Sequence, residues 1–168
     1  FISFESHSCL PLSPQASVNT LLRYKKQGVR YISINVGMDF NPMTQIMAVI
    51  ASFKKQISLS PEMMLITTWS CLQRAKKEGK IGVGFDLEGA VPLLKTPDMV
   101  DVFSELGVRQ IHLAYNRNNR AAGGCHDTPQ GLSKIGKILI KRIQSTGIIV
   151  DMSHNSIQTS LDICTITE

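Results

Sequence analysis

The sequence predicts a parallel α/β fold, in which short apolar strands alternate with helices. First, four segments share one plan: a helix-like stretch, a glycine, a β-rich run and a polar tip. Glycine suits the left-handed residue just past a helix end, so the run after each glycine is expected to be a strand. Second, helices that alternate with strands imply crossover connections, which make the strands parallel. The four segments are Lys25–Gly37, Lys76–Gly89, Ser104–Asn116 and Ile143–Asn155.

About five strands are expected. The first enters within Phe1–Glu5, and the others follow the glycines of the shared plan. The stretch Met63–Thr68 (MMLITT) is a weaker candidate for one more strand. Near-continuous apolar runs such as Ile148–Val150 favour a sheet that is covered on both faces. Apolar residues at helical spacing predict helices at Val18–Gln27, Pro42–Ile57, Thr68–Glu78, Pro97–Leu106 and Gly131–Thr146.

Length and composition favour a single α/β domain over residues 1–168. A chain of 168 residues with 43% hydrophobic content can bury a proper core, and no linker or composition shift divides it. It has no run of about 18 apolar residues, so no membrane span is expected. The start, FISFESHSCLPL, lacks an initiator Met and a basic region ahead of an apolar one. It therefore does not indicate a signal peptide, and a few further N-terminal residues are expected before it.

Charge and cysteine usage limit the partners and the compartment. The net charge of +5 comes from 18 basic and 13 acidic residues, and the basic residues are scattered. Lysine pairs in helix-like segments favour solvated helix faces over a nucleic-acid surface. The four cysteines are far apart and have no CxxC spacing. Reduced thiols in a cytoplasmic compartment are therefore expected rather than a disulfide framework.

Polar side chains gather where the predicted strands end. Functional groups of parallel α/β folds lie beyond the carboxyl ends of the strands, so these tips are expected to form one site. His7, Cys9, Glu88 and His154 are ligand types that suit zinc, and a carboxylate between two imidazoles can bridge two ions. The five tips contain His7, Ser8 and Cys9; Asn35 and Gly37; Asp86 and Glu88; Tyr115, Asn116 and Asn118; and Asp151, Ser153 and His154.

Each of these residues also has a purely structural interpretation, which spacing alone leaves open. A histidine at a strand end is more often a hydrogen-bonded or surface residue than a ligand. Glu88 fits a turn, and Cys9 fits a small buried apolar residue. Asp86 and Asp151 are expected to orient neighbouring groups or to bind backbone amides. The pair Gly82–Gly84 lies inside a strand and does not open a helix, so it is a weak signal for nucleotide binding.

Four stretches together resemble the membrane dipeptidase (renal dipeptidase-like) family of zinc peptidases. They are SHSCLPL, IGVGFDLEGA, LGVRQIHLAYNRNN and GLSKIGKILIKRIQSTGIIVDMSHNS. The resemblance runs from about His7 to Asp162, is strongest from Gly82 onward, and depends on the order of the motifs. It implies an amidohydrolase-type (β/α)8 TIM-type barrel with two bridged zinc ions. The roughly five strands of this chain would be a partial barrel, the first half to two-thirds of it.

The resemblance also implies metal ligands. The family's early His-x-Asp motif falls on His7 and Cys9, its bridging glutamate falls on Glu88, and its fifth-strand histidine falls on His154. Cys9 thus replaces an aspartate, so that metal position is expected to be thiolate-bound, weaker or empty.

A second set of residues is expected to meet the substrate. The family's substrate-contacting histidine falls on Tyr115, which can donate a hydrogen bond to an oxyanion but cannot be a cation near neutral pH. Tyr115 and Asn118 are therefore the expected substrate contacts, and Glu88 and Tyr115 are the expected catalytic residues.

The length of the chain shapes two further expectations. A (β/α)8 barrel takes roughly 250 residues. The family's later His ligand, its substrate-binding Arg and its late catalytic Asp would lie on strands after Glu168. This chain alone is therefore expected to hydrolyse dipeptides very poorly or not at all. Its open sheet is expected to form a homo-oligomer or to bind a complementary fragment.

The predicted function is zinc-dependent hydrolysis of the amide bond of dipeptides or similar small amides by a metal-bound hydroxide. Two alternatives stay open. One is a barrel remnant kept as a non-catalytic binding module, and the other is a five-stranded doubly wound domain that binds a small ligand. The zinc content of purified protein separates the first possibility from the other two.

Overall fold

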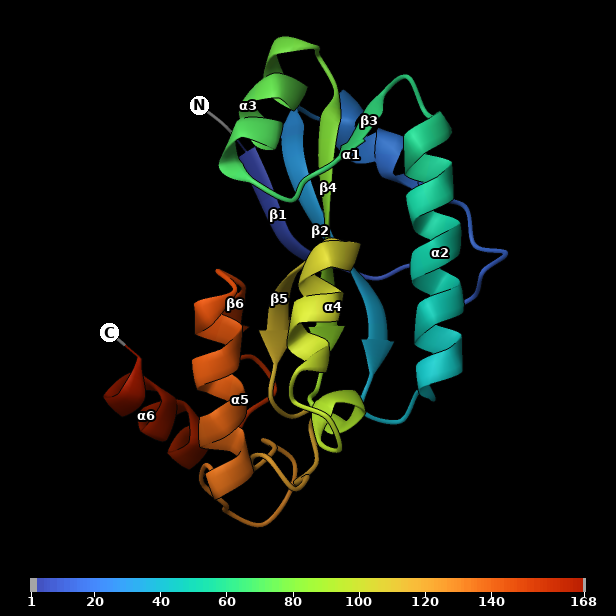
Figure 1. Cartoon of the computed structure of the whole chain (residues 1–168). Helices are drawn as coiled ribbons and strands as arrows, with labels where there is room; N and C mark the ends of the chain where they lie inside the picture. Colours follow the sequence, from blue (N-terminus) through green and yellow to red (C-terminus); the bar gives the residue numbers. More distant parts are fainter. Residues whose placement is uncertain (1–2, 168) are drawn as a thin grey trace.

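Six parallel strands form one sheet in the computed structural model, which describes residues 3–167 (Figure 1). Five strands lie in sequence order, β1-β2-β4-β5-β6, and β3 pairs with the start of β4. β4 therefore has β2 along one edge, and β3 followed by β5 along the other. The strands are β1 (Ser3–Ser8), β2 (Val29–Met38), β3 (Met63–Leu65), β4 (Ile81–Glu88), β5 (Val108–His112) and β6 (Ile149–Asp151).

This sheet is a half-barrel. Parallel strands in sequence order, with helices on one side, are the arrangement of a (β/α)8 barrel. A doubly wound domain would reverse its strand order at a switch point, and the observed order has no reversal, so that alternative was wrong. The predicted strands are confirmed, including the weaker candidate, which forms β3. Phe1 and Ile2, which the predicted first strand included, lie outside the described residues.

Helices α1 to α5 connect successive strands, and α6 follows the last strand. They are α1 (Leu22–Lys26), α2 (Met43–Leu59), α3 (Trp69–Lys77), α4 (Met99–Leu106), α5 (Lys134–Ser145) and α6 (Ile157–Ile166), with short 3₁₀ turns η1 (Val18–Leu21) and η2 (Val91–Leu93). Thr68, Ser133 and Ser156 cap α3, α5 and α6 by accepting backbone N–H groups. Gly107 ends α4 with φ of 104°, as the sequence plan predicts. Within residues 3–167, no helix has the length and apolar content needed to cross a membrane.

The two faces of the sheet differ in chemistry. Helices α2, α4 and α5 lie side by side over one face (Figure 1), where Ile34, Phe85 and Ile111 are fully buried. Along each strand successive side chains alternate between the faces. The inner face consequently carries buried polar groups, namely Ser33, Asn35, Asp86, Glu88, Gln110 and His112. Near-continuous apolar strands in a sheet covered on both faces were expected, and this was wrong for the inner face, which carries these polar groups.

Glycines in β4 make room on the inner face for side chains of neighbouring strands. A Cβ atom at Gly84 would lie 2.1 Å from the hydroxyl oxygen of Tyr31, and one at Gly82 would lie 2.7 Å from the side chain of Ile66. The GxG pair thus serves close packing across the sheet. Because glycine has no side chain, Tyr31 of β2 and Ile66, which follows β3, can pack over β4 from its two edges.

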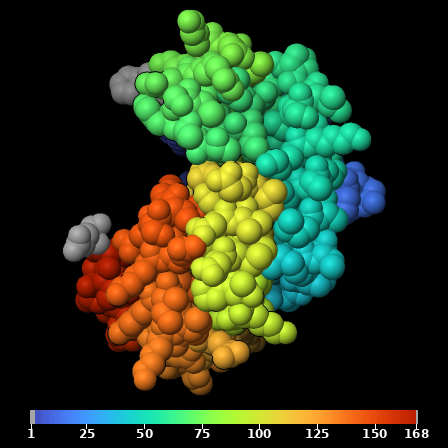
Figure 2. Space-filling model, viewed as in Figure 1, coloured from blue at the N-terminus to red at the C-terminus, as the bar shows by residue number. Residues whose placement is uncertain are grey.

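The outer strands β1 and β6 leave their outer edges unpaired within residues 3–167. Phe4 on β1 is 51% exposed, and Ile149 on β6 is 62% exposed. A cavity of about 620 Å³ lies between these strands, and its lining includes both residues together with Tyr31 and Trp69. Figure 2 shows the surface hollowed between the green segment of α3 and the yellow and orange segments of α4 and α5. Open strand edges and exposed apolar side chains favour association.

We expect the 168-residue chain to self-associate at micromolar concentration. The reason is that β1 and β6 have unpaired outer edges, and their exposed apolar side chains Phe4 and Ile149 line the same cavity. Sedimentation velocity should show species larger than a monomer, and Ile149→Lys should shift the distribution toward monomer. Leu59→Lys, at another exposed apolar position at the end of α2, is the matched control and should leave the distribution unchanged. A monomer whose β6 amides are strongly protected from hydrogen exchange would contradict this expectation.

Candidate metal centre

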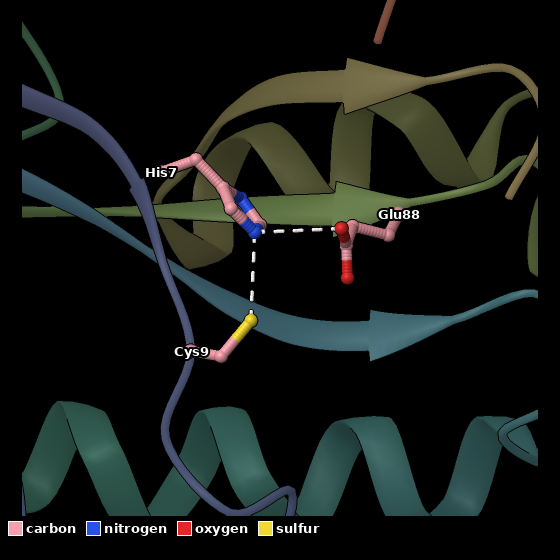
Figure 3. A group of neighbouring side chains, drawn as sticks. All are labelled: His7, Cys9 and Glu88. Carbon is pink, nitrogen blue, oxygen red and sulfur yellow. Dashed lines mark hydrogen bonds and ion pairs between the residues drawn. The ribbon is translucent and has the colours of Figure 1, made fainter. Parts of the chain in front are cut away.

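Three residues predicted as metal ligands converge at the carboxyl ends of the strands. His7 lies on β1, Glu88 ends β4, and His154 follows β6. Glu88 Oε1 lies 3.4 Å from His7 Nε2 and 3.2 Å from His154 Nε2. The Cys9 Sγ atom lies 3.4 Å from His7 Nε2, and Figure 3 shows His7 between Cys9 and Glu88. The structure therefore brings all four predicted ligands together at one end of the half-barrel.

Hydrogen bonds fix the orientation of both imidazoles. His7 Nδ1 lies 3.1 Å from Asp86 Oδ1, and the hydroxyl of Ser33 donates to Asp86 Oδ2 at 2.7 Å. His154 Nδ1 lies 2.9 Å from Asn116 Oδ1, an acceptor, so His154 donates from Nδ1. In each histidine the Nδ1 atom is thus engaged, and the Nε2 atom faces Glu88. Outer partners of this kind orient metal-ligating histidines.

The backbone at His154 has an uncommon conformation. His154 has φ of 66° and Asn116 has φ of 61°, and these are the positive-φ residues other than glycine in the described chain. Asparagine and histidine occur in the left-handed region more often than most residues, but the conformation still costs free energy that the surroundings must compensate. The two residues are hydrogen-bonded to each other. This strain lies where the chain leaves β6 and turns the imidazole toward Glu88.

Glu88 is a buried carboxylate, only 2% exposed. The amide of Asn35 donates to its Oε2 atom, while Oε1 faces the two imidazoles. Burial raises the pKa of Glu88, and the Asp86 charge raises it further, while His7 and His154 act in the opposite direction. A positive charge close to Glu88 would therefore stabilise its ionised form.

Cys9 lies beside His7, and Tyr115 lies beside His154. Burial and the charges of Glu88 and Asp86 raise the pKa of the Cys9 thiol. The Tyr115 ring centroid lies 4.8 Å from that of His154, and its backbone N–H donates to Asp39 Oδ2 at 3.1 Å. Burial first, and then the charge of Glu88, raise the pKa of Tyr115. Its phenol therefore stays protonated at neutral pH and can donate a hydrogen bond.

The structure places Asn118 differently from the other predicted residues. Asn118 is half-buried in the loop after β5, and its amide donates to Thr128 O at 3.0 Å. Its Oδ1 atom accepts from Gly124 N, and its own N–H donates to Asp127 Oδ2. Asn118 thus connects the two arms of the loop over residues 116–128. It lies outside the group around Glu88, and substrate contact by its side chain stays a prediction.

The two aspartates have the orienting contacts that the sequence predicts. Asp86 accepts from His7 and Ser33, as described above. Asp151 Oδ1 accepts from Ser153 N at 2.7 Å, and its Oδ2 accepts from Gln110 Nε2 at 2.5 Å. Both carboxylates face the interior of the half-barrel, next to the candidate ligands.

One member of the group was missed by sequence reasoning. His112 ends β5 in register with Glu88 on β4 and with Asp151 on β6. Its ring centroid lies 5.8 Å from that of His7 and 5.7 Å from that of His154. Burial lowers the pKa of His112, although Asp151 and Asp86 oppose this, so the ring is neutral at pH 7. The alternation Gln110, Ile111, His112 was the available signal, because it places His112 on the inner face.

Among residues 3–167, donor atoms lie within 4.8 Å of one another in three combinations. Imidazole nitrogen, carboxylate oxygen and thiol sulfur are the donors that zinc uses in proteins. The combinations are His7, Cys9 and Glu88; His7, Asp86 and His112; and Glu88, His112 and His154. The strand ends thus provide a candidate site for one or more metal ions.

Comparison with known proteins identifies the family. A family model described as membrane dipeptidase (Peptidase family M19) matches residues 38–168. Dipeptidase verJ of Clonostachys rogersoniana is 28% identical over 112 residues, which cover 65% of this chain and 29% of that protein.

Solved structures share the fold. An amidohydrolase from Pseudomonas aeruginosa superposes with a TM-score of 0.89 at 21% identity, over 99% of this chain and 50% of that one. A metallo peptidase from Rhodobacter sphaeroides, liganded with a phosphinate mimic of the dipeptide L-Ala-D-Ala, gives a TM-score of 0.80 at 14% identity. That match covers 100% of this chain and 63% of the other. The chain therefore spans about half the length of these relatives and corresponds to one half of their barrel.

The family model covers more than three quarters of the chain, and it includes the strand ends that carry Glu88, Tyr115 and His154. The chain belongs to the membrane dipeptidase family, peptidase family M19.

Proposed function

We propose that this protein is a zinc-dependent hydrolase of the dipeptidase type, which cleaves the amide bond of dipeptides or similar small amides. The observation that carries the proposal is the position of Glu88 Oε1, a buried carboxylate oxygen that faces the Nε2 atoms of both His7 and His154. Family membership supports a dipeptidase-type reaction. The metallo peptidase with the dipeptide mimic supports a small peptide as the substrate class.

The residues present fit zinc. Both imidazoles have their Nδ1 atoms engaged by oxygen acceptors, so their Nε2 atoms are available as ligands. Zinc takes imidazole nitrogen, carboxylate oxygen and cysteine sulfur at about 2.0–2.3 Å. His7, Cys9, Glu88 and His154 would hold it, with Glu88 shared between two ions. When bound, zinc polarises a carbonyl group and lowers the pKa of water.

Two features of the protein itself serve the substrate: the phenol of Tyr115 and a cavity beside it. The Tyr115 phenol, next to His154, is placed to donate a hydrogen bond to the oxygen of the amide carbonyl as negative charge develops there. A cavity of about 460 Å³ lies beside it, lined by Asp39, Phe40, Tyr115 and Asn118 among others. We assign this cavity to a substrate side chain, with Tyr115 and Asn118 as its polar contacts.

A second candidate function is a non-catalytic binding module of the same family. Two positions favour it: Cys9 stands where the family pattern has aspartate, and Tyr115 stands where it has histidine. Zinc binding without any zinc-dependent hydrolysis in the native protein would select this alternative.

Zinc binding tests the ligand set. Glu88→Ala is expected to abolish binding, because it removes the only carboxylate that faces both imidazoles in the described residues. Cys9→Ala is expected to lower the zinc content measured by mass spectrometry of metals in purified protein. Cys164→Ala, which removes an exposed thiol on α6, is the matched control. Zinc content unchanged in Cys9→Ala but lost in Glu88→Ala would remove Cys9 from the ligand set.

Asp86 provides a test of ligand orientation. Asp86→Asn weakens the acceptor that holds His7, so zinc affinity is expected to fall about 10–100-fold with no ligand removed. Competition with a zinc chelator measures the affinity. Asp98→Asn, at an exposed carboxylate before α4, is the control and should leave the affinity unchanged. Equal affinities for Asp86→Asn and the original protein would argue against an orienting role.

Hydrolysis tests the reaction. The native protein loaded with zinc is expected to release amino acids from dipeptides, and Glu88→Ala is expected to abolish the release. The 168-residue chain by itself should hydrolyse dipeptides very slowly or not at all. The reason is that His7 and His154 are partly open to solvent within the described residues, so water is poorly excluded. Rapid turnover by this chain would show that residues 3–167 already contain every catalytic group.

A further inference from the structure

His112 has an environment that ordinary packing does not explain. The side chain is about 2% exposed, yet neither ring nitrogen has a hydrogen-bond partner within the described residues. Its Nε2 atom approaches Asp151 Oδ2 at 3.4 Å without hydrogen-bond geometry. That oxygen already accepts from Gln110. A buried polar group without a partner costs about 1–3 kcal/mol, so such groups are rare in native proteins.

The position of His112 is set by the strands. β5 places it on the inner face, opposite Glu88 on one side and Asp151 on the other. Its ring is stacked against that of His154, with an angle of 27° between the planes. Unlike His7 and His154, its ring has neither nitrogen engaged by an oxygen acceptor, so either nitrogen is free to present its lone pair to a cation, depending on the tautomer.

Two of the donor combinations include His112, and hydrogen bonds distinguish them. In one, His112 joins His7 and Asp86, but Asp86 already accepts from His7 Nδ1 and Ser33. Using these atoms for a metal would release the imidazole that Asp86 orients. In the other, His112 joins Glu88 and His154, whose facing atoms are 3.2 Å apart. Ligands held about 2.1 Å from a tetrahedral ion lie roughly 3.4 Å from one another, so this pair is already at the required separation.

We propose that His112 is a metal ligand, and that Glu88, His112 and His154 together hold one ion. A second ion is held by His7, Cys9 and Glu88, so the two sites share Glu88. This proposal rests on the proposed function and adds to it a ligand on β5. Three protein ligands with one open position are typical of catalytic rather than structural zinc. The unpartnered nitrogen of His112 gains a partner when the ion binds.

Metal stoichiometry tests the proposal. The chain is titrated with Co²⁺ or Zn²⁺, and bound metal is counted by mass spectrometry after gel filtration. The original chain is expected to bind two ions and His112→Gln one ion, with the cysteine-to-cobalt absorption of the Cys9 site retained. His126→Gln, at a histidine in the loop of residues 116–128, is the matched control and should still bind two. His112→Cys, which offers a replacement ligand, should restore the second ion.

Several results would overturn the assignment. One is two ions of unchanged affinity in His112→Gln. Another is a single ion in the original chain that His112→Gln leaves in place. A chain that binds no metal at all would overturn the proposed function as well, which distinguishes the two failures.

A measurement without substitution covers the case in which the variants do not fold. In the cobalt-loaded original chain, paramagnetic NMR should show hyperfine-shifted ring signals from three histidines. Signals from only two histidines would exclude His112 as a ligand.

Discussion

The buried charge of Glu88 is the constraint on which the strand ends depend. A carboxylate removed from water is costly unless hydrogen bonds or positive charge compensate it. Asn35 donates to one of its oxygens, and the imidazoles of His7 and His154 face the other. Asp86, two residues earlier on the same face, adds a second negative charge and holds one of these imidazoles. A bound cation would complete the compensation, which would couple metal binding to the stability of the strand ends.

Much of this arrangement could be predicted from the sequence, because topology determines it. Parallel strands have their carboxyl ends on one side, so the tips that carry His7, Glu88 and His154 had to meet. His112 escaped prediction because β5 was expected to run on to Tyr115, and only the register with β4 shows which residue faces Glu88. The polar inner face was missed for a similar reason, since composition alone does not say which of two alternating sets is covered by helices.

Membership of the family gives the class of chemistry, whereas two substitutions at the strand ends give this chain its own character. A thiol at Cys9 is a softer donor than a carboxylate, and its protonation depends strongly on whether a cation is close. A phenol at Tyr115 donates a hydrogen bond without carrying charge. A protonated cysteine in place of aspartate removes a negative charge near Glu88, whereas tyrosine in place of histidine removes a potential positive charge.

Because β4 lies in the middle of the sheet, it affects how the candidate metal centre folds and how it would release an ion. The bond between Ser33 and Asp86 joins residues 53 positions apart, and such non-local pairing makes folding slow. Once formed, β4 has neighbours along both edges, so its amides should be among the last to exchange with solvent. Asp86 and Glu88 therefore sit on the most persistent strand, while Cys9 and His154 sit on segments that flank the outer strands. Release of a bound ion would begin with local opening of those outer segments, while both carboxylates stay in place.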